Sequence, residues 1–346
     1  MNVYLGQKYH PVSFKDVHAQ VHCAAGYLMR KGLRKGDHVG LLSGPGLRYH
    51  VLNLALQYIG AVNVTLPIDM ETAQVEALSK QFNFKMLFVD EVEQFIAHGE
   101  FKDMKEQLLL VTIGEDEVDT LDPDKIITYD ILVTLGKAAW REDIEELKAS
   151  KAALLPKDLY SILVEDNGKS QKVSMQKWMD TVQAAKEKLA KVEAKSVLNL
   201  LNPDRLQQRA YCFAAIQKGI LFWSRKANST EKVAFSNIQP ELVLLYPVSM
   251  KTLFTKLPIY LEQEEKGQKA IDTALEVIGK KKAAAAEKKK DPILNRIKYR
   301  THNKKLYKRI KAKLGGRIVE MFLDDGPLDA DSKTIFEESG IRISQS

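Results

Sequence analysis

The sequence predicts an α/β fold with two lobes, each a mainly parallel sheet with flanking helices. Three observations support this prediction. The chain has 346 residues, enough for about two or three ordinary domains. Hydrophobic residues make up 45% and charged residues 28%, which is typical of a globular protein with a buried core. Short apolar runs alternate with helix-like segments, and this alternation indicates crossover connections between parallel strands.

The first lobe opens with an amphipathic segment, residues 13–31. Its apolar residues recur every three or four positions, which predicts a helix with one buried face. Ser13 is the expected N-cap and Gly32 the expected stop. A polar, acidic stretch at residues 114–156 is interpreted as a connection between lobes, with a helix at about 138–149. Strands separated by helices are expected at residues 37–43, 62–67, 85–90 and 108–113.

The second lobe continues the alternation of strands and helices. A Lys-rich linker at about 280–291 and a basic helix at about 292–313 interrupt it. We therefore place the lobes at residues 1–156 and 157–346. The expected strands are residues 160–164, 196–201, 219–223, 242–246, 317–323 and 341–344, and the expected helices are residues 176–192, 248–262, 268–278 and 331–339.

The positive charge is confined to one region. Residues 280–317 contain sixteen Lys and Arg residues and two acidic residues, a local excess of +14, whereas the whole chain carries +7. Apolar residues interleave with this charge along the basic helix, a pattern that suits an anionic membrane surface and equally a helix covering a core. Nucleic-acid binding is not expected, because no recognised nucleic-acid motif is present and the remainder of the chain is net acidic.

Cysteine and histidine positions predict neither a disulfide framework nor a metal site. Cys23 and Cys212 are the two cysteines, too few for a disulfide framework. Separately, no apolar run approaches the roughly 20 residues that are needed to span a bilayer. His18 and His22 have the spacing of metal ligands, but no third ligand is evident nearby, so they are expected to be ordinary helix residues. A cytoplasmic protein is expected, with peripheral contact to the inner face of a membrane as an option.

Four stretches, at residues 13–42, 58–67, 239–253 and 314–328, carry a family resemblance. They are similar, in the same order, to the N-terminal region of the AMP-forming acyl-CoA synthetase superfamily, most of all to its long-chain fatty acid ligase branch. The resemblance implies the N-terminal domain fold of adenylate-forming enzymes. It also implies ATP with Mg and CoA as cofactors, and a fatty acid that becomes an acyl-adenylate and then a thioester.

The stretch that resembles the family's phosphate-binding loop, residues 158–173, departs from the family pattern. Glu165 and Asp166 replace its Ser, Thr and Gly residues. At about 4 Å a like-charge pair costs about 1 kcal/mol in water and about 4 kcal/mol at an effective dielectric of about 20. The carboxylates therefore disfavour phosphate. Gly168, Lys169 and Lys172 are the candidates for a remaining phosphate contact.

Two further motifs also differ from the family. Residues 323–328 read Leu-Asp-Asp-Gly-Pro-Leu, with Asp324 and Asp325 where the family has small residues, and residues 200–204 lack the family's histidine. The family's ribose-binding aspartate and catalytic lysine would follow residue 346.

The sequence therefore predicts an AMP-binding, acyl-CoA synthetase-like protein that is catalytically incomplete, with no catalytic residue assigned. In a longer form, its reaction would be ATP-dependent fatty acid activation. The alternative is a non-catalytic scaffold that binds an acyl ligand or a protein, associated with a membrane surface through the basic helix. A third hypothesis is a basic adaptor for membranes or nucleic acids. The expected partners are a fatty acid or acyl ligand and an anionic membrane, and the sequence does not specify an oligomeric state.

Overall fold

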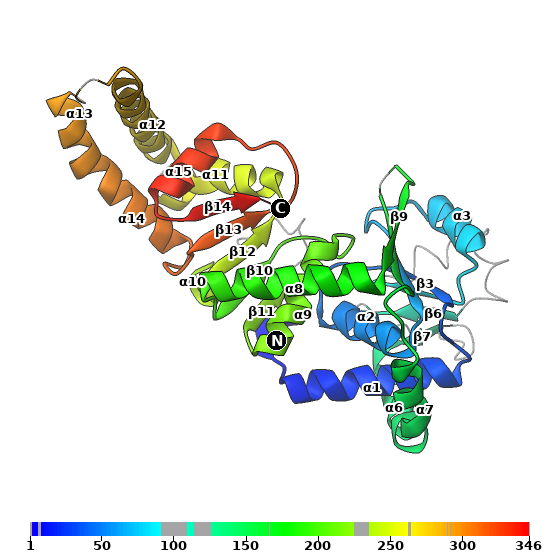
Figure 1. The fold of residues 1–346 in the computed structure, drawn as a ribbon. Coiled ribbons are helices and arrows are strands. Elements are labelled where there is room, and N and C mark those ends of the chain that lie inside the picture. The colour runs from blue at the N-terminus through cyan, green and yellow to red at the C-terminus, as the bar shows by residue number, and fades with distance from the viewer. Residues whose placement is uncertain are drawn as a thin grey trace. The chain divides into compact units, whose positions relative to one another are not determined.

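The computed structural model describes residues 2–5, 8–90, 109–113, 126–165, 167–224, 235–261, 264–288, 290 and 292–345. It confirms the α/β fold with mainly parallel sheets and flanking helices (Figure 1). The chain forms two compact units. The first consists mainly of Met1–Lys188 and Asn202–Gly219, and the second of Leu189–Leu201, Ile220–Trp223 and Ala227–Ser346.

The sheet of the first unit has the order β7-β6-β5-β3-β4-β8-β9. Neighbouring strands are parallel, except that β9 runs antiparallel to β8. Every residue of β4 and β5 is buried, as expected for strands covered on both faces. The bounds are β3 (His38–Leu42), β4 (Val62–Thr65), β5 (Met86–Val89), β6 (Leu109–Thr112), β7 (Ile126–Thr128), β8 (Leu159–Val164) and β9 (Ser170–Ser174).

The helices of the first unit begin and end at local signals in the sequence. The Ser13 side chain accepts a hydrogen bond from the Asp16 N–H at 3.1 Å, and Gly60 ends α2 with a φ of +75°. Both features confirm that local caps set the boundaries. The bounds are α1 (Phe14–Arg30), α2 (Leu47–Ile59), α3 (Thr72–Phe82), α6 (Tyr129–Glu142), α7 (Ile144–Ala152), α8 (Met175–Val192) and α9 (Leu206–Lys218).

The stretch interpreted as a connection between lobes contains a strand and two helices of the first unit, so the single helix predicted at about 138–149 is wrong. Thr128 ends β7, and its side chain caps α6 by accepting from the Ile131 N–H at 3.3 Å. Asp143 separates α6 from α7. The local composition is polar because α6 buries only part of its surface, against α1.

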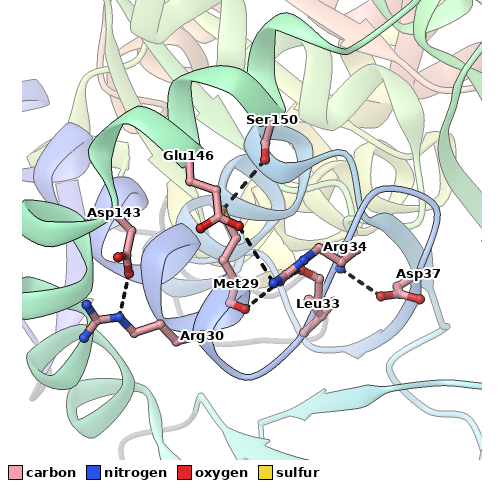
Figure 2. Close-up of polar contacts among 8 residues, drawn as sticks. All are labelled: Met29, Arg30, Leu33, Arg34, Asp37, Asp143, Glu146 and Ser150. Carbon is pink, nitrogen blue, oxygen red and sulfur yellow. Dashed lines mark hydrogen bonds and ion pairs between the residues drawn. The ribbon is translucent and has the colours of Figure 1, made fainter.

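Polar contacts join the carboxyl end of α1 to α6 and α7 (Figure 2). Arg30 donates from Nε to Asp143 at 2.6 Å. Arg34 donates from Nη1 to the backbone oxygens of Met29 and Leu33 at 2.7 and 2.9 Å, and its N–H donates to Asp37 at 2.8 Å. The side chains of Arg30 and Asp143 are 40% and 28% exposed, so this ion pair contributes little to stability.

The strands of the second unit follow the order β14-β13-β12-β10-β11. The β10–β12, β12–β13 and β13–β14 pairs are parallel. The strand bounds are β10 (Ser196–Asn199), β11 (Leu221–Ser224), β12 (Leu242–Leu245), β13 (Glu320–Leu323) and β14 (Arg342–Gln345). The helices are α10 (Phe235–Ile238), α11 (Pro247–Leu261), α12 (Glu264–Ala286), α13 (Ile293–Lys298), the π-helical turn η1 (Tyr299–Asn303), α14 (Lys304–Lys313) and α15 (Ala330–Glu338).

The predicted Lys-rich linker overlaps the end of α12, which continues to Ala286. The predicted basic helix is divided into α13, η1 and α14. Near the N-terminus, β1 (Asn2–Leu5) and β2 (Lys8–Pro11) pair antiparallel. Among the helices of the described residues, none has the length and apolar character needed to span a bilayer.

The close approach of α1 to α6 generates a stability prediction at Gly136. A Cβ atom added there would lie 2.0 Å from the carbonyl oxygen of Cys23. We expect Gly136→Ala to lower the free energy of unfolding by about 1–3 kcal/mol, because the helices must separate. Urea denaturation followed by circular dichroism measures the change.

Gly279→Ala is the matched control, because a Cβ atom at Gly279 in α12 would meet no atom within 4 Å. This variant should raise the free energy of unfolding by about 0.5–1 kcal/mol through helix propensity. Equal stability of the two variants would contradict the packing described for α1 and α6.

Candidate functional site

The hairpin turn between β8 and β9 lies within residues 158–173, the stretch that the sequence analysis compares with the family's phosphate-binding loop. The Glu165 N–H donates to the Lys169 carbonyl oxygen at 2.8 Å, and the Gly168 N–H donates to the Glu165 carbonyl oxygen at 2.9 Å. The Lys169 N–H donates to Oδ1 of Asn167 at 2.8 Å. Three backbone donors are therefore bonded within the turn, whereas an anion-binding nest requires donors that point outward.

The three predicted phosphate contacts lie on this hairpin. Gly168 and Lys169 are in the turn, and Gly168 has a φ of +78°, which favours glycine. Lys172 lies on β9 opposite Ile162. Both lysines are exposed, and Asp166 is outside the described residues. A phosphate contact at Gly168, Lys169 and Lys172 remains a prediction.

The acidic replacement at residues 323–328 lies just after β13. Asp324 is buried, and Gln345 holds its backbone by donating from Nε2 to the carbonyl oxygens of Asp324 and Gly326 at 3.2 and 2.7 Å. This end of a parallel strand is where ligands usually bind in α/β proteins. A buried acidic residue, Asp324, therefore follows directly after β13 at this end of the sheet.

A buried polar network in the first unit was not predicted from the sequence. Asn63 donates from Nδ2 to Oδ1 of Asn53 at 2.8 Å, and Asn53 donates from Nδ2 to the Tyr160 hydroxyl at 3.0 Å. The Ser161 hydroxyl donates to the Asn63 carbonyl oxygen at 2.7 Å. All four residues are buried, on α2, β4 and β8. The network satisfies polar groups that these strands and helices place in the core.

Arg209 brings a positive charge to this network. Its side chain is 1% exposed, and Nη1 donates to the Ser161 hydroxyl at 3.1 Å. The guanidinium also lies 5.5 Å from the centre of the Tyr160 ring. Nε and Nη2 have no hydrogen-bond partner, and among the described residues no acidic side chain pairs with Arg209. A buried cation without a counter-charge is destabilising.

His50 of α2 is buried close to Arg209 of α9. Burial, and secondly the charge of Arg209, lower the pKa of His50 to about 3. The Nε2 atoms of Gln208 and His50 are 3.3 Å apart, at hydrogen-bond distance. The imidazole is therefore neutral at physiological pH, and it adds no further positive charge to the cluster.

His18 and His22 form part of an aromatic cluster. Nδ1 of His22 is 2.8 Å from the His18 carbonyl oxygen, and the two rings are 4.1 Å apart. The His22 ring also packs against Tyr58 and Trp140, and burial lowers the pKa of His22. Across the part of the chain that the structure describes, no group of three or more His, Cys, Asp or Glu residues is arranged to hold a metal ion.

Residues 2–163 match the family model described as AMP-binding enzyme. No curated protein matches the sequence. The match covers the five parallel strands β3 to β7 of the first sheet, and β8 up to Leu163. This match supports the resemblance to the adenylate-forming superfamily.

Solved structures share the fold. The A-PCP didomain of carboxylic acid reductase from Segniliparus rugosus in complex with AMP has a TM-score of 0.67 and 12% identity, over 98% of this chain and 46% of that one. The adenylation domain of the carboxylate reductase from Mycobacterium chelonae has a TM-score of 0.61 and 16% identity, over 98% and 51%. The luciferase-like enzyme from Zophobas morio has a TM-score of 0.62 and 12% identity, over 97% of this chain and 65% of that one. The chain spans about half the length of the two reductase chains.

The unpaired charge of Arg209 generates a stability prediction. We expect Arg209→Met to leave the free energy of unfolding within about 1 kcal/mol of wild type, or to raise it, because the buried charge is removed at similar volume. Arg209→Ala should lower it by about 2–5 kcal/mol, because it leaves a cavity. A loss of about 3 kcal/mol or more in the Met variant, measured by urea denaturation, would show that the charge is compensated.

The low pKa of His50 predicts a pH dependence. Between pH 6.5 and about 3 the unfolded chain binds a proton that folded His50 does not, so the contribution of His50 to stability falls as pH falls. The slope is up to about 1.4 kcal/mol per pH unit. His50→Gln should flatten the dependence in urea titrations between about pH 6.5 and 4.5. Identical slopes in the two proteins would contradict the burial of a neutral His50.

Proposed function

We propose that the chain is an AMP-binding, long-chain acyl-CoA synthetase-like protein that is catalytically incomplete at its phosphate loop. The observation that carries the proposal is the closed β8–β9 turn, whose backbone donors are bonded to the turn itself. The family match over residues 2–163 and the adenylate-forming fold support the first part of the proposal.

The turn opposes triphosphate binding in two ways. A phosphate that used the N–H groups of Gly168 and Lys169 would have to break two hydrogen bonds, each worth about 1 kcal/mol net. It would also approach the exposed carboxylate of Glu165. The ammonium groups of Lys169 and Lys172 supply attraction, but they are exposed, where charge interactions are weak.

The turn therefore does not fit the triphosphate of ATP with Mg. The substrate class that the resemblance implies is a fatty acid, activated for transfer to CoA. That activity requires a phosphate site that this turn does not supply. Binding of ATP-Mg and binding of an acyl ligand can be measured separately.

Titration of the chain with ATP-Mg, AMP and a long-chain fatty acid, by thermal shift and calorimetry, tests the proposal. We expect no ATP-Mg response in wild type, in Lys169→Ala or in Lys177→Ala. The last variant is the matched control, because Lys177 is an exposed lysine on α8 outside the turn. Stabilisation by the fatty acid alone would support an acyl-binding relative.

A different outcome would overturn the proposal that the phosphate site is incomplete. If ATP-Mg binds with micromolar affinity, and Lys169→Ala abolishes this binding while Lys177→Ala keeps it, the turn must open to form a nucleotide site. If no ligand gives a thermal shift or a binding heat, the result would argue against an acyl ligand and would be consistent with the closed turn.

A further inference from the structure

We propose that the exposed tip of a basic helical hairpin in the second unit docks on an anionic phospholipid bilayer. The hairpin consists of α12 and the run α13–η1–α14, which lies alongside α12 (Figure 1). We refer to residues 264–313 as the basic hairpin. Three features of the hairpin support this docking: the side that is buried, the apolar residues that remain exposed, and the charge around them.

Contacts with α12 fix the inner face of the run α13–η1–α14. Asn295 donates from Nδ2 to the Val277 carbonyl oxygen at 3.1 Å, and Asn303 donates from Nδ2 to the Ala274 carbonyl oxygen at 3.2 Å. Both asparagines are buried, and the Lys281 ammonium lies 4.2 Å from the centre of the Tyr299 ring. The run therefore cannot rotate freely to bury a different set of side chains.

Three large apolar side chains are left outside by this packing. Ile293 is 68% exposed, Leu294 is 75% exposed and Ile297 is 52% exposed. Ile293 and Ile297 are four residues apart in α13, so they lie on the same side of the helix. We call these three residues the apolar wedge. They stand next to the turn between α12 and α13, where no other described helix covers them.

The apolar wedge is surrounded by positive charge. Residues 280–317 carry an excess of +14, and the rest of the chain is net negative. This charge is complementary to a surface of phosphatidylserine or another anionic lipid, which attracts basic segments within a Debye length. The exposed basic residues between the end of α12 and α14 include Lys288, Lys290, Arg296, Lys298, Arg300, Lys304, Lys305 and Lys308.

A bilayer fits both properties of this surface, whereas a nucleic acid fits only one. Phosphate backbones attract the lysines and arginines but offer no apolar phase to isoleucine and leucine. At a bilayer surface the cations meet headgroups while the wedge enters the boundary between headgroups and acyl chains. The juxtaposition of an exposed apolar wedge and a concentrated positive charge therefore favours a lipid surface.

Vesicle flotation with the full chain tests the proposal. We expect binding to phosphatidylcholine vesicles that contain about 30% phosphatidylserine and little binding to pure phosphatidylcholine. Binding should fall steeply between about 50 and 300 mM NaCl, because salt screens the attraction. The variant Ile293→Ser/Leu294→Ser/Ile297→Ser should bind anionic vesicles about tenfold or more weakly, because it loses apolar contact with the bilayer.

The matched control is Val248→Ser/Ile259→Ser, which changes two exposed apolar residues of α11, 68% and 57% exposed, outside the basic hairpin. It should bind as wild type does. Circular dichroism checks that both variants fold, since all substituted side chains are exposed.

The proposal is overturned if wild type does not bind anionic vesicles, if it binds neutral and anionic vesicles equally, or if the wedge variant binds as wild type does. Tighter binding to single-stranded RNA than to anionic vesicles, unchanged in the wedge variant, would also overturn it and assign the basic surface to nucleic acid. These outcomes do not depend on nucleotide binding at the β8–β9 turn, so they are independent of the proposed function.

Discussion

The burial of central parallel strands on both faces is the constraint on which the first unit depends. Every residue of β4 is buried, including the polar Asn63 and Thr65. Buried polar groups require partners, and the partners of Asn63 come from the covering helix α2 and the neighbouring strand β8. The same layer buries Arg209 of α9, whose charge is only partly satisfied. A sheet covered on both sides thus determines both the core and the position of the polar cluster around Asn63.

The same sheet determines what stands at the candidate nucleotide site. Strand β8 pairs in parallel with β4 on one side and antiparallel with β9 on the other. A short antiparallel connection has to close as a tight turn, and this turn closes by bonding its own donors. The shared fold and the altered loop are therefore compatible. The chain shares its fold with solved adenylation domains, while the N–H groups of the turn between β8 and β9 are bonded within the turn.

Local signals predicted most of the fold, because apolar runs and caps act over a few residues. The helix capped by Ser13 and the strands near His38 and Val62 are confirmed. The break at Asp143 was missed, since it depends on packing of α6 against α1. The polar network was also missed, because Arg209 and Ser161 are far apart in sequence. In the basic helix the sequence showed interleaved apolar residues, but only the structure separates buried Leu306 and Ile310 from the exposed apolar wedge. The internal hydrogen bonds of the turn at residues 165–169 could not be predicted from the residue types alone.

The most direct test of the closed turn is NMR spectroscopy of the backbone amides of Gly168 and Lys169 during addition of ATP-Mg. Amide chemical shifts report directly on the hydrogen bonds that these two N–H groups make. The structure predicts that both amide signals stay unchanged up to millimolar ATP-Mg, because their donors remain bonded within the turn. Progressive, saturating shifts of both amides would contradict this account, because they would show that the turn opens and that its donors bind phosphate.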